Sequence, residues 1–344
     1  MHHNTRTHTL LRCLAAIAGI SSIPTTLAAE SEDSIQLLQA TDRYGPWQVP
    51  RAEFDAFLAN HPNATGNYAI TGPNISAPAE STSSGNESTI DGWSWSIVVS
   101  ADLPLANTTL APEDDGEGPF YHTGGGMTLN APSSLLGPGG NLTVDDGWKI
   151  CLFTWQIDDF PYSDKLRSDD GTCKSVLSDE CIANMKLAAA SATVEGSCSC
   201  PIASSIPSCS CLGDAAKVFN NNCYGFSRNA SDIREWAGGK LETYAFGDAT
   251  AHHLGNNTAY NNIGSLAFPA LISFRNKDEI NGVTDGSMTS LSCVRAADAI
   301  SGSTVPGDAE SSGNRLGTGA TAGIALVLYG LCMSMLQINW VASF

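Results

Sequence analysis

The chain has 344 residues and a formal net charge of −18 at pH 7, from 35 acidic and 17 basic residues. All the acidic residues lie between Glu30 and Glu310, where only 14 Lys and Arg accompany them, so this body carries a formal charge of −21. Binding to nucleic acid requires clustered cationic side chains, so the composition excludes a nucleic-acid partner. An acidic body of this kind stays soluble and repels anionic surfaces.

The N-terminus has the order of a secretory signal peptide. Two arginines precede the apolar run Leu14–Ile20, and Ala28 ends a small-residue pattern that signal peptidase cleaves. We therefore expect residues 1–28 to be removed and the mature chain to begin near Ala29.

A short helical segment and a polar linker are predicted next, over residues 29–61 and 62–90. Helices are expected at 34–40 and 51–59, and the second places three apolar side chains on one face: Phe54, Phe57 and Leu58. The linker is dominated by Asn, Thr, Ser, Gly and Pro, which are too polar to bury a core. We interpret it as a glycosylated boundary before the main domain.

A β-rich ectodomain is predicted over residues 91–300. Trp93, Trp95, Ile97 and Val99 occupy every second position, and residues 149–157 alternate in the same way, which is typical of strands. Further short apolar pieces at 244–246 and 266–274 predict a second set of strands. Pairs suited to tight turns recur at Asp91, Asp115, Asp146, Asp170, Asn281 and Asp285, each followed by Gly.

The cysteines divide the mature chain. None occurs from Ala29 to Ile150, whereas eight lie in the cluster 151–223 and one stands alone beyond it. This density in a secreted chain indicates disulfides, and the odd total leaves one thiol free or paired between molecules. The nine candidates are Cys151, Cys173, Cys181, Cys198, Cys200, Cys209, Cys211, Cys223 and Cys293.

The cluster also contains helical pattern, and it offers an alternative to disulfides. A helix is predicted at 178–190, with Ile182, Met185 and Ala189 on one face. The fold class is therefore α+β: a β-rich, disulfide-stapled ectodomain with short helices in the cysteine cluster. The Cys-Ser-Cys pairs at 198–200 and 209–211 have the spacing to chelate Cu(I) or Zn(II). We predict no metal and no cofactor, because secreted thiols are usually oxidised first.

The C-terminal end follows the order of a glycosylphosphatidylinositol signal. Residues 301–312 are predicted as a short Ser/Gly stalk, and Ser311 and Ser312 stand among small residues before a polar spacer. Arg315 is the last charged residue, and the 29 residues after it end the chain on an apolar tail. We expect a lipid at Ser311 or Ser312 and removal of residues 313–344.

The alternative is a retained single-pass helix with an extracellular body. A helix needs about 20 apolar residues to cross a bilayer. The apolar run ends at Gln337 after 15 residues, and no Lys or Arg follows to hold a cytoplasmic end. Lipid anchoring is therefore the preferred prediction.

Seven N-glycosylation sequons lie between the two processed ends, where a secreted chain carries glycans. They begin at Asn63, Asn74, Asn86, Asn107, Asn141, Asn229 and Asn256.

Pairs of acidic residues are the first candidates for chemistry, because glycosidases place two carboxylates on either side of the scissile bond. Acids on turn signals are usually solvated turn formers, so we predict no catalytic pair. Calcium binding through the same oxygens is the other alternative, although no EF-hand loop is present. The candidates are Glu113, Asp114, Asp115, Glu117, Asp145, Asp146, Asp158 and Asp159.

Histidine and tryptophan provide the remaining candidates. His122 opens His-Thr-Gly-Gly-Gly, a run similar to the oxyanion loop of esterases, but the sequence has no G-x-S-x-G partner for it. His252 and His253 cannot point to one side of a strand, and we interpret them as surface imidazoles. Trp93 and Trp95 share one strand face, and we predict core rather than sugar stacking.

The order of signal peptide, glycan-rich body, disulfide cluster, Ser/Gly stalk and small-residue attachment site resembles the lipid-anchored, N-glycosylated surface proteins of filamentous fungi. The resemblance covers the architecture and matches no family motif. It implies residence at the outer plasma membrane or cell wall, anchored in the outer leaflet and in contact with wall polysaccharide or other surface proteins. We predict a structural or interaction role, with a wall-glycan glycosidase or transglycosylase as the alternative.

Overall fold

The computed structural model describes residues 37–40, 46–79, 89–104, 120–155, 163–191, 193–194, 197–209, 219, 223–277 and 288–307. The chain divides into two units, Met1–Ser34 and Ile35–Phe344, and every described residue belongs to the second. This unit has the predicted α+β class, with antiparallel sheets, short helices and four disulfides. The predicted signal peptide, lipid-attachment serines and tail lie outside the described residues.

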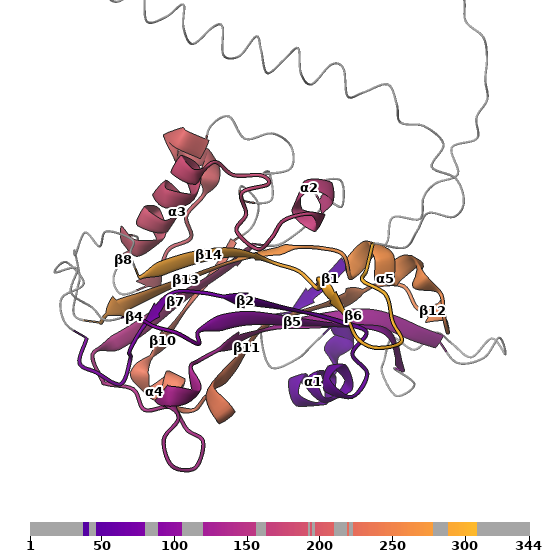
Figure 1. The fold of residues 1–344 in the computed structure, drawn as a ribbon, viewed down its shortest axis with the longest axis horizontal. Helices are drawn as coiled ribbons and strands as arrows, with labels where there is room; N and C mark the ends of the chain where they lie inside the picture. Colours follow the sequence, from indigo (N-terminus) through magenta and orange to yellow (C-terminus); the bar gives the residue numbers. More distant parts are fainter. Residues whose placement is uncertain are drawn as a thin grey trace, which may run out of the picture. The chain divides into compact units, whose positions relative to one another are not determined.

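The larger sheet has the strand order β1-β11-β6-β5-β2-β15, with β12 also paired to β6 (Figure 1). In β5, Trp95, Ile97 and Val99 are buried while Ser96 and Val98 between them stay partly exposed, which confirms the predicted alternation. Its strands are β1 (Leu37–Ala40), β2 (Ala64–Ala69), β5 (Ser94–Pro104), β6 (Phe120–Asn130), β11 (Lys240–Asp248), β12 (His252–His253) and β15 (Asp298–Ala299).

One predicted helix is a strand instead. Residues 37–40 form β1, which pairs antiparallel with β11 from Ala245 to Asp248. The helix prediction at 34–40 is therefore wrong over these four residues. A segment of four residues is too short to form a stable helix by itself. Here its backbone hydrogen bonds to β11 decide its conformation.

The smaller sheet has the strand order β10-β7-β13-β14. Every residue of β7 is buried, because the larger sheet lies on one side of this sheet and the cysteine-rich segment on the other. Its strands are β7 (Trp148–Trp155), β10 (Cys223–Asn229), β13 (Phe268–Asn276) and β14 (Thr289–Val294). Two small ladders pair β3 (Gly72–Pro73) with β4 (Thr89–Ile90) and β8 (Thr193–Val194) with β9 (Ser197–Cys198).

The two sheets pack face to face around one apolar core, and Figure 1 shows β13 and β14 layered over β2 and β5. Aromatic rings join the layers. The ring centroids of Trp93 and Phe274 are 4.8 Å apart, and those of Phe246 and Phe268 are 4.3 Å apart. Burial of Trp93 and Trp95 confirms the prediction that this pair belongs to the core.

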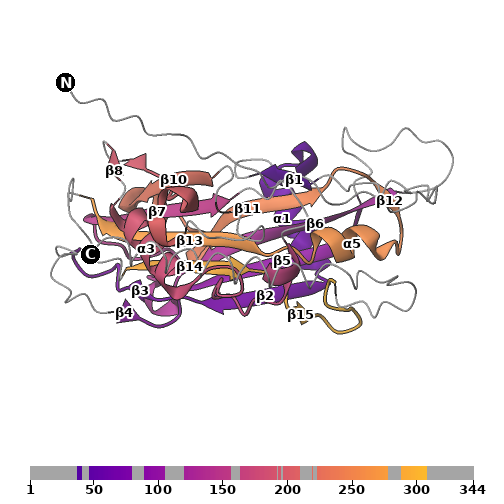
Figure 2. The ribbon, with the colours of Figure 1, turned by 90° about the horizontal axis from the view of Figure 1, so that it is seen from above.

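Helices cover the outer faces of both sheets. The predicted helix at 51–59 is α1, which buries Phe54 and Leu58 against β5 and β6, and the predicted helix at 178–190 is α3, which packs on β13 and β14. Figure 2 shows α5 beside β5 and β6. The α-helices are α1 (Arg51–Asn60), α2 (Ser163–Arg167), α3 (Asp179–Ser191), α4 (Ala230–Arg234) and α5 (Asn257–Ile263), and the 3-10 turns are Pro46–Gln48, Ser133–Leu135, Ala203–Ser205, Pro207–Cys209 and Ala237–Gly239.

Four disulfides hold the smaller sheet and the segment outside it. The bridge between Cys173 and Cys293 ties the C-terminal third of the chain to the cysteine cluster. The ninth candidate, Cys211, lies outside the described residues. The other bridges join Cys151 to Cys198, Cys181 to Cys209 and Cys200 to Cys223.

The described chain ends against α5. The hydroxyl of Tyr260 donates to the carbonyl of Thr304 at 2.6 Å, and Pro306 is buried. Residues 301–307, predicted as part of a stalk, therefore pack on the body. Within the described ranges, the helices all fall short of the length and apolarity needed to cross a membrane.

Candidate functional site

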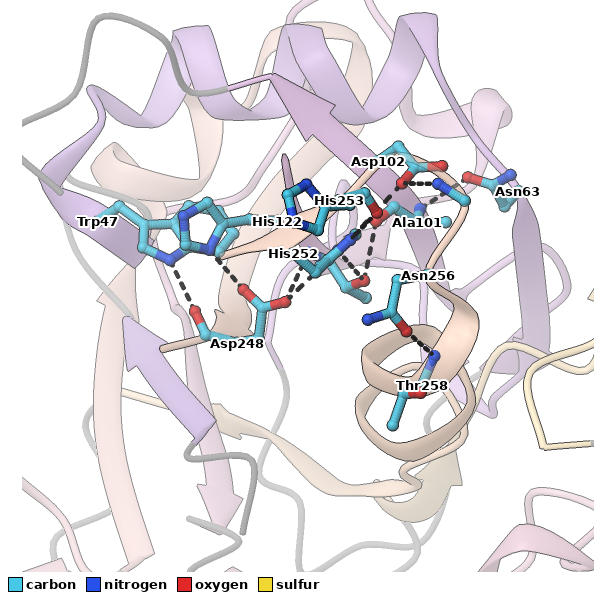
Figure 3. A network of polar contacts seen from close by, with 12 residues as sticks. Trp47, Asn63, Ala101, Asp102, His122, Asp248, His252, His253, Asn256 and Thr258 are labelled. Atoms are coloured by element: carbon cyan, nitrogen blue, oxygen red, sulfur yellow. Dashed lines mark hydrogen bonds and ion pairs between the residues drawn. The ribbon is translucent and has the colours of Figure 1, made fainter. Parts of the chain in front are cut away.

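A cluster of histidine and aspartate side chains lies at one end of the larger sheet, where four strands meet. Its members are Asp102 from β5, His122 and Thr123 from β6, Asp248 from β11 and His252 from β12. We call these five residues the histidine–aspartate cluster. Figure 3 shows Asp248 between the imidazoles of His122 and His252.

Asp248 is the centre of the cluster and is fully buried. Its Oδ1 lies 2.6 Å from Nδ1 of His122, and its Oδ2 accepts the backbone N–H of Thr123 at 3.0 Å. A buried carboxylate needs such donors, because an unpaired charge away from water is costly. Asp248 therefore fastens the end of β11 to β6 through its side chain.

His252 extends the cluster toward the surface. Its Nε2 lies 3.3 Å from the hydroxyl of Thr123 and 3.8 Å from Oδ2 of Asp248. Its Nδ1 lies 3.0 Å from the carbonyl oxygen of His253 and 3.8 Å from Oδ1 of Asp102. The ring thus sits between two carboxylates.

The two adjacent histidines face opposite ways, as predicted. His252 is buried, and His253 is exposed and stacks on Phe120 with ring centroids 5.1 Å apart. The prediction of a surface imidazole is therefore wrong for His252. The reason is tertiary: β12 pairs with β6, so alternate side chains turn toward the interior.

The glycine run after His122 is strand, not loop. Gly124 and Gly247 leave space for the indole of Trp47, since a Cβ on Gly247 would lie 2.3 Å from Cζ2 of Trp47. The seated indole lies 4.8 Å from the ring of His122 and donates its N–H to the carbonyl of Asp248 at 2.7 Å. The glycine run is therefore not an oxyanion loop like that of esterases, because the space beside Gly124 is filled by the indole of Trp47.

Trp47 also takes an unusual backbone conformation. Its φ is 59°, a left-handed value that is uncommon for a residue other than glycine. Such conformations persist where the surroundings determine them. Here the buried indole and its hydrogen bond to Asp248 supply those surroundings.

The chemistry available to the cluster is limited by its burial. Nε2 of His122 is buried and has no hydrogen-bond partner among the described residues. Within the same described part of the chain, no group of three or more His, Cys, Asp or Glu is placed to hold a metal ion. The geometry is that of an interior polar network that positions four strands.

No family model, curated protein or solved structure matches this chain. The site is therefore interpreted from its own geometry.

The predicted carboxylates that the structure describes belong to turns. Oδ1 of Asp145 accepts the backbone N–H of Gly147 at 2.9 Å, which closes the turn before β7. Asp146 pairs with Arg234, and the hydrogen bond and charge of that guanidinium lower the pKa of Asp146. The other predicted acids lie outside the described residues: Glu113, Asp114, Asp115, Glu117, Asp158 and Asp159.

The structure places the other predicted site residues in structural roles. Cys198, Cys200 and Cys209 are bridged, so their sulfurs are not available as metal-binding thiolates. Of the sequons, Asn63 uses its side-chain oxygen to accept the backbone N–H of Ala101 at 2.7 Å. Asn86 and Asn107 lie outside the described residues.

Sequence analysis missed Asp248, Trp47 and Asp102. A weak signal exists for Asp248, which stands four residues before His252. A spacing of this kind is common by chance, and only the pairing of β11 and β12 with the same strand brings the two side chains together.

Proposed function

We propose that this chain is a lipid-anchored, N-glycosylated protein of the outer cell surface or wall, with a structural or interaction role. Four disulfides indicate a domain that folds in an oxidising, extracellular compartment, and this supports the proposal. Wall polysaccharide and other surface proteins are the partners that such a position offers.

The proposal of a structural or interaction role rests on one observation: the candidate catalytic side chains that the structure describes are engaged in contacts within the protein. Asp145 closes a turn, Asp146 pairs with Arg234, Trp93 and Trp95 fill the core, and His122 is buried on Asp248. A catalytic group must reach a substrate. Because each of these side chains is engaged in a turn, an ion pair or the core, we favour a surface protein that acts by its shape and its contacts.

Glycosylation is supported by the positions of three sequons. Asn141, Asn229 and Asn256 are exposed, and the last two begin α4 and α5. A glycan on an exposed turn or helix start does not disturb the core. Asn63 is different, because its amide is bonded to Ala101 and lies 3.4 Å from the hydroxyl of Ser303.

The anchor proposal is tested by release from membranes. Phosphatidylinositol-specific phospholipase C should release the protein from intact cells, and truncation after Gly313 should send it into the medium. Retention after both treatments, with the tail detected by mass spectrometry, would instead support the single-pass alternative.

The role is tested with purified, glycosylated ectodomain on β-glucan, chitin and mannan. We expect no hydrolysis and no transglycosylation. Amide variants at Glu113, Asp115, Glu117 and Asp158 should each change stability by about ±0.5 kcal/mol. The amide variant at Asp145 tests activity alone, because Oδ1 of Asp145 also closes the turn before β7. Turnover of a wall glycan that falls by about a hundredfold in one variant would establish the enzyme alternative and identify its acid or base.

A further inference from the structure

The side-chain amide of Asn63, the first residue of a sequon, is held on both sides. Its Oδ1 accepts the backbone N–H of Ala101 on β5 at 2.7 Å, a contact that Figure 3 shows. Its Nδ2 donates to the hydroxyl of Ser303 at 3.4 Å. Only an oxygen can accept from the N–H of Ala101, so the amide cannot turn its nitrogen elsewhere without losing that bond. Nδ2 of Asn63 therefore faces the end of the described chain.

Residues 298–307, here called the C-terminal segment, pack along Asn63. β15 pairs with Ala64 and Thr65 of β2, and the backbone N–H of Ile300 donates to the carbonyl of Asn63 at 2.9 Å. A turn follows, in which the backbone N–H of Ser303 donates to the carbonyl of Ile300 at 2.9 Å. This turn brings the hydroxyl of Ser303 to the amide of Asn63. The backbone and the side chain of Asn63 thus both hold the segment.

Glycosylation uses the same nitrogen. An N-linked glycan replaces a hydrogen of Nδ2 with a bulky sugar, whose first carbon lies about 1.5 Å from the nitrogen. The hydroxyl oxygen of Ser303 is 3.4 Å from Nδ2 of Asn63, so the sugar and the turn at 300–303 require the same space. Asn256 differs, because its Oδ1 accepts the backbone N–H of Thr258 at 3.0 Å and the residue is exposed. A glycan at Asn256 therefore displaces no other segment.

We propose that a glycan on Asn63 and the seated C-terminal segment exclude each other. A chain with an unmodified Asn63 holds residues 298–307 on the body, and a chain that carries a glycan there releases them. The choice sets where the chain leaves the body: beyond Gly307 in the first case and after β14 in the second. Because the predicted attachment serines follow, the glycan changes the length of chain between body and anchor. This inference rests on the proposed N-glycosylation and adds what one sequon regulates.

Hydrogen exchange of the purified glycosylated protein tests the exclusion, with glycopeptide mapping of each sequon on the same sample. Thr65→Val removes the sequon but keeps Asn63, so the backbone N–H groups of residues 300–303 should exchange slowly. In the unaltered protein, the fraction of molecules with fast exchange there should equal the fraction with a glycan on Asn63. The matched variant Thr258→Val removes the sequon of Asn256 and should leave exchange at 300–303 unchanged.

Two results would overturn the proposal. One is a molecule that carries a glycan on Asn63 and still exchanges slowly at residues 300–303. The other is fast exchange in Thr65→Val, because no glycan is then present to release the segment. If Thr65→Val does not fold, the comparison of the two fractions in the unaltered protein decides.

The reverse change covers a protein in which Asn63 carries no glycan. Ile300→Pro removes the N–H that bonds to the carbonyl of Asn63 and should unseat the segment. Occupancy of Asn63 should then rise to that of the exposed Asn141, and unchanged occupancy contradicts the proposal.

A protein without any glycan separates this inference from the proposed function. If Asn141 is also unmodified, the proposed glycosylation fails, and an N-glucosyltransferase added to the purified protein then tests the exclusion. It should modify Asn141 in the unaltered chain and in Ile300→Pro, but Asn63 in Ile300→Pro alone. Any other pattern at Asn63 contradicts the exclusion.

Discussion

The two sheets are stabilised by different means. The strands of the larger sheet and α1 contain no cysteine, whereas the smaller sheet and the segment 163–209 contain all eight bridged cysteines. The larger sheet has long ladders, with nine paired positions between β5 and β6 on either side of a bulge. The segment 163–209 has short helices and a two-residue ladder, so covalent links replace the contacts that long strands would provide.

Close packing and polar contacts take the place of disulfides in the larger sheet. Trp47 fills the space above Gly124 and Gly247, and Asp248 ties β11 to β6. Cross-links stabilise mainly by restricting the unfolded chain, whereas packing stabilises the folded one. The comparison therefore predicts that the two regions respond to different kinds of substitution.

Removing a disulfide should have the largest effect. The bridge between Cys173 and Cys293 closes the longest loop, with a separation of 120 residues, so a double alanine variant should lose about 2 to 5 kcal/mol of unfolding free energy. The matched control is the bridge between Cys181 and Cys209, with a separation of 28, which should cost about 1 kcal/mol less. Urea denaturation measures both.

Peptide mapping without reduction checks the pairing on which this rests. It should recover the four bridged peptide pairs, with Cys211 in none of them, because the other eight candidate cysteines are already joined to one another. If the double variants of the Cys173–Cys293 and Cys181–Cys209 bridges lose equal unfolding free energy, loop length does not determine how much each bridge stabilises the protein.

Filling the space under Trp47 should have the next largest effect. Gly247→Ala forces its Cβ against Cζ2 of Trp47, and overpacking of this kind costs about 1 to 3 kcal/mol. Gly126→Ala is the control, because the nearest atom there, 3.0 Å away, is the end of the flexible Leu58 side chain. Thermal unfolding should show a lower Tm for the first and little change for the second. A second substitution, Trp47→Leu, should partly restore the Tm of Gly247→Ala. If it does not, the loss of stability in Gly247→Ala does not come from contact with the indole of Trp47.

The smallest effect is expected on the outer face of the larger sheet. Burial raises the pKa of Glu242, Asp55 on α1 raises it further, and the hydroxyl of Thr128 opposes the shift. The fold thus favours the protonated acid, and stability falls as pH rises from the ordinary range of glutamate through the raised value. Glu242→Gln should raise Tm slightly at pH 7 and leave it unchanged at pH 3.5.

Thr128→Val provides the opposite test at the same site. It removes the hydroxyl that bonds to the carboxylate of Glu242, so it should lower Tm at pH 7. A pH-independent effect of Glu242→Gln would mean that the charge of this residue does not matter to the fold.

The sequence correctly predicted the elements in which the spacing of apolar residues matches the face that is buried in the fold. The alternation in β5 and the apolar face of α1 are local signals that the packed core preserves. β1 escaped prediction because its partner, the end of β11, lies about two hundred residues away in the chain, and only that pairing makes it a strand. Propensity over four residues is too weak to decide against tertiary contacts.

The histidine–aspartate cluster shows the same limit. Both His122 and His252 stand out in the sequence, but the residue that joins them, Asp248, comes from a third strand. Its burial and its hydrogen bonds depend on β11 and β12 both pairing with β6, which no residue spacing encodes. The disulfide pairing was unreadable for the same reason, although the presence of bridges was confirmed.

The way the described chain ends gives it a defined response to mechanical force. A pull on the chain beyond Gly307 acts first on the contacts of residues 294–307 with α5 and β2, which include the backbone bond from Ile300 to Asn63. At Cys293 the force is transmitted through the disulfide to Cys173, in the segment that precedes α3. At about 3.5 Å per extended residue, the 14 residues that peel away have a contour length of about 50 Å, which sets the upper limit of the extension. The fold therefore yields by a short, fixed length under tension and then stops at a covalent bond, a response that single-molecule pulling would record as one brief first extension.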